Sequence, residues 1–462
     1  MNTTIPNALQ TAIEHQQAGR LSQAEAVYRQ ILQIKPDHPD ALHLLGMVAH
    51  QEGRNEVAVE LIGRAIRAKP SEAMYHNNLG LVLEKKGTLD AAVESFRKAI
   101  LIKPGYAKAH CNLGDVLQSQ GNLKEAITSY QEALSLTPGY AEAHFRLGQA
   151  LLSMGMFYEG WQEYEYRWEG GSPRKPRPAT VLPQWTGQPP LVGDSLLIFA
   201  EQGMGDKIQF SRYLPLAADR FKGRISIVVD HPLLTLFRRS FPEIEILDAT
   251  PDDQSPWQWH CPLLSLPLAF NTLPETILRK IPYLIPDPMK TGRWKAKIDA
   301  LDLPAESRKI GVVWKPGSAM NTASQRSLTL QQLAPLLNHP GCTWFSLQKE
   351  PDPDKSSWVA SGKLVDWAEE FCDFDETTAL LVNLDLVISV DTSVAHLAGG
   401  LGCPTWLFNR HASEWRWMRD RDDSPWYPSM RIFTQKIAGD WDEVVKRMSA
   451  ELLTMGETTT VR

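Results

Sequence analysis

The chain has 462 residues, a net charge of −6 at pH 7, and a composition of 43% hydrophobic and 22% charged residues. This predicts a globular protein of about three domains, at roughly 150 residues each. The acidic balance without a basic stripe argues against a nucleic-acid partner, and no apolar run reaches the roughly 18 residues of a membrane span.

The first third of the chain is periodic. Prolines recur every 34 residues, at Pro36, Pro70, Pro104 and Pro138, and other positions keep the same phase. These are glycines (46, 80, 114, 148 and 53, 87, 121, 155), small residues (Ala24, Ala58, Ala92, Ala126) and bulky residues (Tyr28, Ile62, Phe96, Tyr130). The pattern resembles the tetratricopeptide repeat (TPR), a helical hairpin that stacks on its neighbours into a solenoid. We therefore predict a solenoid of about five repeats over residues 1–169.

The last repeat is atypical and predicts a cap. It has Gly160 where alanine is expected, followed by an aromatic run at Trp161, Tyr164, Tyr166 and Trp168. Because terminal repeats cover the end of the stack, we expect this run to dock onto the next domain.

The concave groove of a TPR solenoid suits an extended peptide. This arrangement resembles that of O-linked N-acetylglucosamine transferase, which also joins TPRs to a glycosyltransferase domain. That enzyme lines its groove with asparagines. At the sixth position of its repeats, this chain has Gln10, Leu44, Asn78, Asn112 and Arg146. Asn78 and Asn112 are therefore candidates for gripping a peptide, although asparagine is also common there in ordinary repeats.

After the repeats, residues 170–194 hold six prolines and predict a semi-rigid linker. Short apolar runs then alternate with amphipathic segments of helix length, which predicts parallel sheets with crossover helices. Two successive α/β domains are expected, at 195–290 and 305–462, with a seam near 286–307. The predicted strands are Ser195–Ala200, Arg224–Asp230, Ile244–Asp248, Ile310–Lys315, Thr343–Leu347, Leu386–Val390 and Pro404–Phe408.

The first candidate site is the segment EQGMGDKIQFSRYLP, residues 201–215, directly after the first predicted strand. Gly203 and Gly205 permit tight backbone geometry, and Asp206 falls at the start of a helix. Its carboxylate either caps that helix by accepting backbone N–H bonds or projects into the cleft as a general base. The glycines do not form a G-x-G-x-x-G fingerprint, so a nicotinamide site is not predicted.

The second candidate site is SVDTSVAHLAGGLGCP, residues 389–404, where a strand ends and a helix begins. Asp391, Thr392 and Ser393 offer capping groups, and the free N–H groups of a helix start can bind a diphosphate. Thr392 and His396 are four residues apart and share one helix face. His396 either faces the phosphates or is a buried structural histidine.

Three other features of this region have structural interpretations beside functional ones. Gly399 and Gly400 are costly inside a helix and predict close packing against a neighbouring strand. The acidic run 420–423 superficially resembles a metal-binding D-x-D, but a solvated turn fits it better. Four aromatic residues of the tail either pack in the core or stack on a ligand: Trp415, Trp417, Trp426 and Tyr427.

Taken together, residues 195–450 resemble the ADP-heptose:lipopolysaccharide heptosyltransferase group of glycosyltransferases. That group has the GT-B fold, in which two Rossmann-like doubly wound domains face a cleft. The resemblance includes the tail WRWMRDRDDSPWYPSMRIF at 415–433. It implies that Asp206 is the catalytic base and that a basic residue after the first strand of the second domain meets the donor phosphates. Arg326 is the better match for that residue and Lys315 the weaker. The other donor-binding residues that it implies are Gly205, Asp391, Thr392, Ser393 and His396.

The resemblance implies an inverting glycosyltransferase that uses a nucleotide-diphosphate sugar and needs no metal, flavin or nicotinamide. The sugar stays open, and so does the choice between a protein and a saccharide acceptor. The alternative is a non-catalytic TPR adaptor with a vestigial glycosyltransferase domain. The N-terminus lacks a secretory signal and the five cysteines are scattered without C-x-x-C spacing, so we expect a cytoplasmic protein with reduced thiols and no zinc site.

Overall fold

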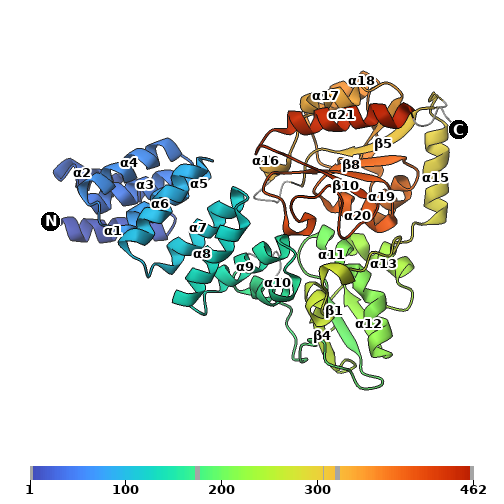
Figure 1. The fold of residues 1–462 in the computed structure, drawn as a ribbon, viewed down its shortest axis with the longest axis horizontal. Coiled ribbons are helices and arrows are strands. Elements are labelled where there is room, and N and C mark those ends of the chain that lie inside the picture. The colour runs from blue at the N-terminus through green and yellow to red at the C-terminus, as the bar shows by residue number, and fades with distance from the viewer. Residues whose placement is uncertain (1–3, 172–176, 305, 318–322, 458–462) are drawn as a thin grey trace. The chain divides into compact units, whose positions relative to one another are not determined.

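The computed structural model describes residues 4–171, 177–304, 306–317 and 323–457 (Figure 1). The chain divides into two compact units. The repeat unit runs up to Ala150 and includes Glu169–Gly171, and the α/β unit holds Leu151–Trp168 and the remainder of the chain.

The repeat unit is a series of antiparallel helical hairpins, as the 34-residue period predicts. Its helices are α1 (Ile5–Gln17), α2 (Leu21–Ile34), α3 (Pro39–Gln51), α4 (Asn55–Ala68), α5 (Ala73–Lys85), α6 (Leu89–Ile102), α7 (Ala107–Ser119), α8 (Leu123–Leu136) and the greater part of α9 (Ala141–Ser153). The predicted small and bulky residues Ala58, Ala92, Ile62 and Phe96 are fully buried.

The periodic glycines have two separate structural reasons. Gly80 lets α5 approach α6 closely, because a Cβ there would lie 2.6 Å from the ring of Phe96. Gly114 has the same relation to Tyr130, at 2.5 Å. Gly87 instead turns the chain between helices with a φ of 80°, which side-chain-bearing residues rarely adopt.

The α/β unit contains two sheets in which every pairing between named strands is parallel. The first has the order β3-β2-β1-β4 and the second the order β10-β9-β8-β5-β6-β7. The strands are β1 (Leu196–Phe199), β2 (Ile225–Val228), β3 (Glu245–Leu247), β4 (Trp259–Pro262), β5 (Arg308–Val313), β6 (Cys342–Ser346), β7 (Val365–Asp366), β8 (Leu386–Val390), β9 (Thr405–Asn409) and β10 (Met430–Thr434). In each sheet the order reverses beside the first strand, at β1/β4 and β5/β8, which is the doubly wound arrangement that places ligands at the carboxyl ends of strands.

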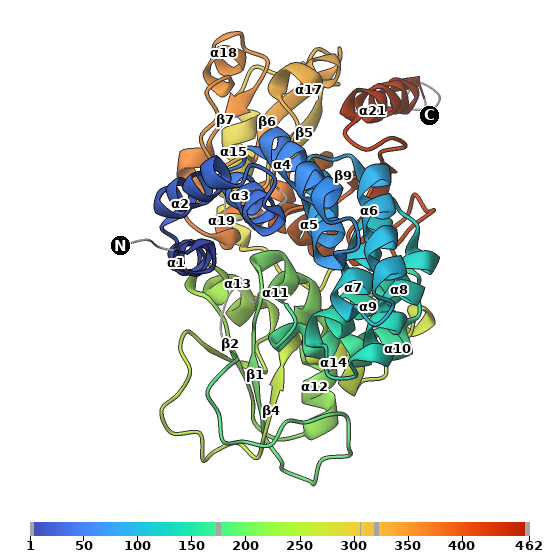
Figure 2. The same cartoon turned by 90° about the vertical axis from the view of Figure 1, so that its left-hand side faces the viewer.

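Helices connect and cover these strands, and α12 contacts β2 in the first sheet. Figure 2 shows the strands of this sheet from a second side, with α12 beside them. The helices of the unit are α10 (Phe157–Tyr164), α11 (Met204–Phe210), α12 (Leu214–Phe221), α13 (Leu234–Ser240), α14 (Leu266–Ala269), α15 (Pro288–Asp299), α16 (Ala323–Arg326), α17 (Leu330–Leu337), α18 (Lys355–Ala360), α19 (Phe374–Leu381), α20 (Ser393–Leu401) and α21 (Trp441–Glu457). All seven predicted strands are present, whereas β4, β7 and β10 were not predicted.

The predicted docking of the last repeat is confirmed. The Trp161 indole N–H donates to the carbonyl of Thr272 at 3.0 Å, and its ring packs edge-on against Trp415 at 5.4 Å. The ring of Tyr164 also packs against Trp415, at 5.6 Å. The helix α10 is therefore part of the core of the α/β unit.

Residues 182–185 of the proline-rich segment 170–194 pack on the first sheet, whereas Gly170 and Gly171 belong to the repeat unit. The Trp185 side chain is fully buried, and its backbone N–H donates to the carbonyl of His260 in β4 at 2.8 Å. Pro173 and Pro176 lie outside the described residues. The segment is thus partly a packed extension of the sheet, because it carries a large indole that needs burial.

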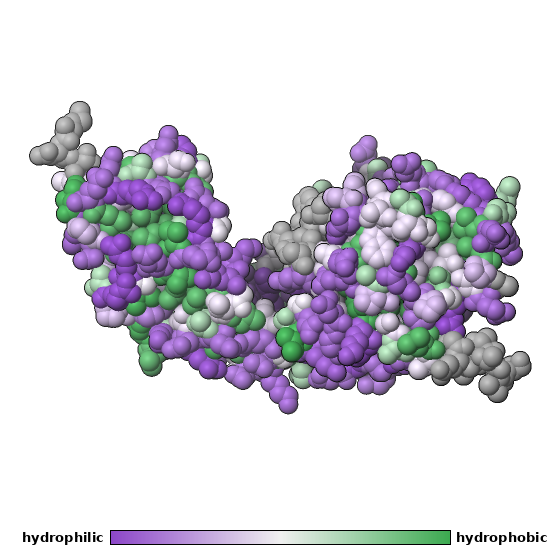
Figure 3. Space-filling model, turned by 90° about the horizontal axis from the view of Figure 1, so that it is seen from above, coloured by the Kyte–Doolittle hydropathy of each residue, from purple (hydrophilic) through white to green (hydrophobic). Residues whose placement is uncertain are grey.

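Hydrophilic residues dominate the face of the molecule shown in Figure 3. Apolar side chains appear there in smaller areas. Within the described residues, none of the helices combines the length and the apolar character needed to cross a bilayer.

Candidate functional site

The candidate site lies at the carboxyl ends of strands in the α/β unit. Asp391 directly follows β8, and Arg326 ends α16 in the connection after β5. Asp206 lies in the first turn of α11, which follows β1 of the other sheet. The helices α11 and α20 are in contact (Figure 1), so the ends of β1 and β8 are close together. The sequence alone predicted each segment, and the fold brings them together.

A chain of ion pairs connects the predicted residues. Arg416 pairs with Oδ1 of Asp206 and, at 2.7 Å, with Glu414. Glu414 also faces Arg326 at 3.5 Å, and Arg326 pairs with Asp391 at 2.8 Å. Both arginines are buried, with 7% of Arg326 and 8% of Arg416 exposed. The chain thus runs from the predicted base to the predicted donor site through two residues that we did not predict.

Asp206 is held at both carboxylate oxygens. The backbone N–H of Gly203 donates to Oδ2 at 2.9 Å, while Arg416 donates to Oδ1. Asp206 therefore caps the start of α11, but as the third helical residue that accepts the N–H of the N-cap residue Gly203, and not as the N-cap itself. This capping does not exclude the general-base interpretation, because each carboxylate oxygen has a second lone pair that can accept another hydrogen bond.

Gly205 and His396 mark the closest approach of α11 and α20. A Cβ on Gly205 would lie 2.6 Å from Cδ2 of His396, so a larger residue cannot fit there. The Nδ1 of His396 lies 2.9 Å from the hydroxyl of Tyr427, and its ring stacks on Trp417. Burial, with the nearby positive charge of Arg416, holds the pKa of His396 well below its ordinary value. His396 is therefore a neutral, buried side chain, as the structural interpretation expects. Its Nε2 lies 3.9 Å from Oδ1 of Asp391, so its role toward a donor stays a prediction.

The N-terminus of α20 lies beside this chain of charges. Thr392 is the N-cap residue and Ser393 the first helical residue, and the Thr392 hydroxyl lies 3.2 Å from that of Ser389. The first N–H groups of a helix have no intrahelical acceptor, and the helix dipole favours an anion there.

A third arginine, Arg410, follows β9 and donates to the side chain of Gln325 at 2.8 Å. Burial, together with the like charge of Arg326, lowers the pKa of Arg410. Two neighbouring guanidinium groups beside a helix N-terminus can stabilise a diphosphate.

Lys315 does not pair with Asp391 of the candidate site. Its ammonium pairs with Asp352 at 2.6 Å, and the Trp314 indole donates to the same carboxylate. Burial opposes the charge of Asp352, but these donors outweigh it and lower its pKa. Of the two basic residues that the resemblance implied, only Arg326 joins Asp391.

The other features of this region take their structural interpretations. Gly399 packs against the ring of Tyr427 and Gly400 against Leu284 and Tyr283, so the predicted close packing is present but the neighbours are not strands. Asp422 and Asp423 of the acidic run are exposed, and Asp423 pairs with Arg421 at 2.7 Å. The four aromatic residues of the tail are all buried, namely Trp415, Trp417, Trp426 and Tyr427. In the described part of the chain, no group of three or more His, Cys, Asp or Glu side chains is arranged for a metal ion.

The groove candidates of the repeat unit form a polar ladder of their own. Asn78 lies 2.8 Å from the imidazole Nε2 of His43, and it accepts a hydrogen bond from Asn77 at 3.0 Å. Asn112 donates to Asn77 at 2.8 Å. The ladder crosses three successive repeats, and its amide groups are hydrogen-bonded to one another and to His43.

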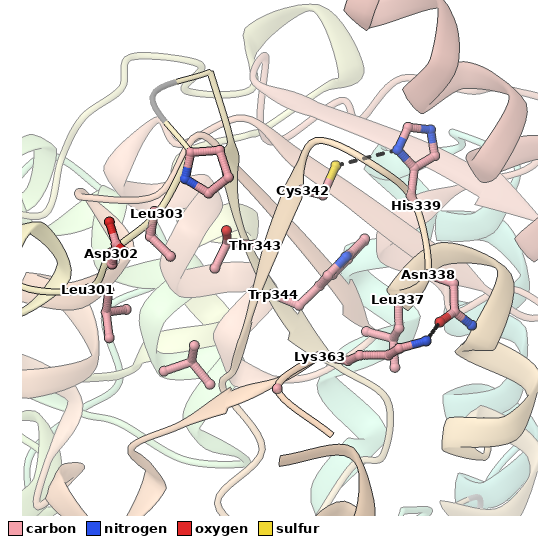
Figure 4. A pocket seen from close by; sticks show the side chains of 13 residues that line it. Leu301, Asp302, Leu303, Leu337, Asn338, His339, Cys342, Thr343, Trp344 and Lys363 are labelled. Carbon is pink, nitrogen blue, oxygen red and sulfur yellow. Dashed lines mark hydrogen bonds between the residues drawn. The ribbon is translucent and has the colours of Figure 1, made fainter. Parts of the chain in front are cut away.

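A pocket of about 470 Å³ lies at the amino ends of the strands β6 and β7 in the second sheet (Figure 4). It is lined by Cys342 and Thr343, where β6 begins, and by Asp302 and Lys363. Because α/β sheets bind ligands at the carboxyl ends of their strands, we do not assign this pocket to the candidate site.

The sequence did not reveal the roles of Glu414 and Arg416. A signal was present, because charged residues interleaved with buried tryptophans in E-W-R-W need partners once they are buried. The identity of those partners depends on α11, which lies far away in the chain.

Comparison with known proteins identifies the repeats. Models described as TPR repeat match residues 85–121 and 114–155, and one described as tetratricopeptide repeat matches residues 15–79. The chain therefore contains tetratricopeptide repeats, which indicate protein or peptide partners.

One curated relative is Protein FlbA of Caulobacter vibrioides, which is 28% identical over 316 residues. The match covers 64% of this chain and 52% of that protein, so the chain spans about half the length of the curated relative that it matches.

Similar solved structures include MamA, at 23% identity, with a TM-score of 0.32 and coverage of 37% of this chain and 96% of that one. PilF of Pseudomonas aeruginosa has 22% identity, a TM-score of 0.34 and coverage of 36% and 75%. YrrB, whose structure is described as a TPR protein with an unusual peptide-binding site, has 20% identity, a TM-score of 0.30 and coverage of 35% and 82%.

Proposed function

We propose that the chain is a TPR-bearing glycosyltransferase of the GT-B fold that transfers a sugar from a nucleotide-diphosphate donor to a hydroxyl group. The observation that supports this most is the juxtaposition of Asp206 from the first sheet with Arg326 and Asp391 from the second. Two doubly wound parallel sheets, meeting at their carboxyl ends around these charges, suit a ligand that both sheets contact.

The chemistry follows from the residues present. Asp206 takes the proton of the acceptor hydroxyl while the hydroxyl oxygen attacks the anomeric carbon from the side opposite the leaving group. The bond from that carbon to the diphosphate breaks, and the configuration inverts. Arg326 and the N-terminus of α20 stabilise the negative charge that the leaving diphosphate gains. The proton ends on Asp206.

The repeat unit supports a protein-binding role within this proposal. Its amide ladder, which includes Asn78 and Asn112, suits an extended segment of a protein acceptor or of a partner that delivers one. A saccharide acceptor requires no such ladder.

A second candidate function is a non-catalytic adaptor. It is favoured by the engagement of both oxygens of Asp206, and by the internal pairing of Arg326 and Arg416 with carboxylates. In such a chain the repeats would bind the partner. The buried ion pairs of Arg326 and Arg416 would only stabilise the fold of the α/β unit.

Calorimetry with UDP, ADP, GDP and CDP separates the two functions. We expect one of them to bind, and the Arg326→Gln variant to lose at least about tenfold in affinity, as for a buried charge that meets a phosphate. With the matching nucleotide sugar, Asp206→Asn should bind at least as tightly as wild type and lose transfer by about 10²–10⁴-fold. If none of the four binds at millimolar concentration, the adaptor is the better description.

A further inference from the structure

Arg416 is the residue that connects the predicted base to the predicted donor site. Its two terminal nitrogens donate to different carboxylates, one to Asp206 and one to Glu414 at 2.7 Å. The guanidinium group lies over the ring of Trp415 at 4.3 Å. Burial opposes its charge, but Asp206 and Glu414 outweigh that effect and raise its pKa. Arg416 therefore keeps its positive charge although it is buried, and its guanidinium group is stacked on Trp415.

The guanidinium groups of Arg416 and Arg326 are separated by one carboxylate. Glu414 accepts Arg416 at one oxygen and faces Arg326 at the other, at 3.5 Å. A diphosphate is longer than a carboxylate and carries more charge, so it can contact both arginines from a position beside Glu414.

Each arginine also keeps an unused donor. The Nε atoms of Arg326 and Arg416 are buried, and neither has a hydrogen-bond partner among the described residues. A guanidinium group has five N–H donors in a planar fork, so a phosphate oxygen can bind first at the unused Nε–H and then displace a carboxylate from a terminal nitrogen.

We propose that Arg416 is shared between the base and the donor: the donor diphosphate competes with Asp206 for its guanidinium group. Donor binding then releases Oδ1 of Asp206 toward the acceptor hydroxyl, while Gly203 keeps holding Oδ2. This inference rests on the proposed function, and it makes Arg416 a donor ligand and a positioning residue for Asp206. It predicts that donor binds before acceptor.

The competition can be measured without any transfer reaction. Affinity for the best-binding member of the UDP, ADP, GDP and CDP panel is measured by calorimetry in wild type, Asp206→Asn, Arg416→Gln and the double variant. Removing the charge of Asp206 should tighten binding by about tenfold, the lower range for close charge pairs. Arg416→Gln should weaken binding by a similar factor, and Asp206→Asn should then have no effect in that background.

Two controls separate this mechanism from general electrostatics. Asp423→Asn makes the same change in net charge at an exposed pair in the same tail, and should alter affinity less than about twofold. Because Arg416→Gln leaves Asp206 without its cation and leaves Glu414 with Arg326 alone, Arg416→Lys supplies a variant that keeps the charge. In the Lys background, Asp206→Asn should again tighten binding several-fold.

The outcomes distinguish the two proposals. If wild type binds none of the four nucleotides, the proposed function fails and this inference fails with it. If wild type binds but Asp206→Asn leaves its affinity unchanged, only the sharing of Arg416 is overturned. Tightening that persists in the Arg416→Gln background also overturns it, because the effect would then not pass through Arg416.

Discussion

The repeat unit and the α/β unit make their decisive contacts over very different distances along the chain. In the repeat unit, Gly114 meets Tyr130 in the next helix, and the same contact recurs one period earlier between Gly80 and Phe96. In the α/β unit, Asp206 meets Arg416 across 210 residues. The first kind of contact is encoded by a local period, whereas the second exists only once the sheets have formed.

The helix α10 lies at the boundary between the two units. By the 34-residue period it is the second helix of the last repeat, yet its aromatic side chains pack in the α/β unit. Substitutions in each unit test this difference.

Trp161→Ala should destabilise the α/β unit by about 3–5 kcal/mol, the usual cost of truncating a buried aromatic residue. The indole is 2% exposed and donates to Thr272, and its ring touches Phe210 and Trp415. Hydrogen exchange followed by mass spectrometry should show lost protection in β1, with α5 protected as before. Tyr158→Ala, on the exposed side of α10, should change stability by less than about 0.5 kcal/mol. Lost protection in α5 alone would place α10 with the repeats.

Gly114→Ala should destabilise the repeat unit by about 1–3 kcal/mol, because the new methyl group overlaps the Tyr130 ring. That ring cannot move freely, since its hydroxyl is bonded to Asp115 and Gln118. Gly63→Ala is the matched control: it is also inside a helix, and its nearest neighbour would be the end of Arg67 at 3.7 Å. There the better helix propensity of alanine should stabilise by about 0.5–1 kcal/mol. Denaturant unfolding measures both, and equal signs would refute close packing as the reason for Gly114.

The contrast between contacts near in sequence and contacts far apart in sequence explains how much of the fold could be predicted. The repeats were predictable because Gly80, Gly87 and Phe96 recur in phase, so each position is supported several times. The strands β1, β5 and β8 were predictable because their apolar runs are buried on both faces. The strand β4, WHCP, was missed because it lacks β-branched residues and ends in proline. It is a strand because it pairs with β1.

The candidate site was predictable only in pieces. Asp206 and Asp391 could be found from their places after strands, but their connection could not, because Glu414 and Arg416 come from a distant loop. The direction of Lys315 was equally hidden, since its partner Asp352 follows a different strand. Charged residues can be located by sequence, but their partners are chosen by tertiary structure.

The smallest expected effect concerns Glu84 on α5, a half-buried carboxylate in the repeat unit. Burial, with the nearby charge of Asp115, raises the pKa of Glu84 to about 7. The folded state therefore holds this proton more tightly than the unfolded state, whose pKa is near the ordinary 4.5. The stability that it contributes is complete below about pH 4.5 and is lost as pH rises through 7.

Glu84→Gln removes this titration, so the variant should match wild type at low pH and exceed it at pH 8. We expect a gain of about 1 kcal/mol, because solvent around a half-buried group screens much of the shift. Denaturant unfolding at pH 4.5 and pH 8, followed by circular dichroism, measures the difference. Glu60→Gln, at an exposed position of α4, is the control for the substitution of glutamate by glutamine itself. A Glu84→Gln gain that is equal at pH 4.5 and pH 8 would mean that Glu84 ionises as it does in the unfolded chain. The packing of the repeats around Glu84 would then leave the ionisation of its carboxylate unchanged.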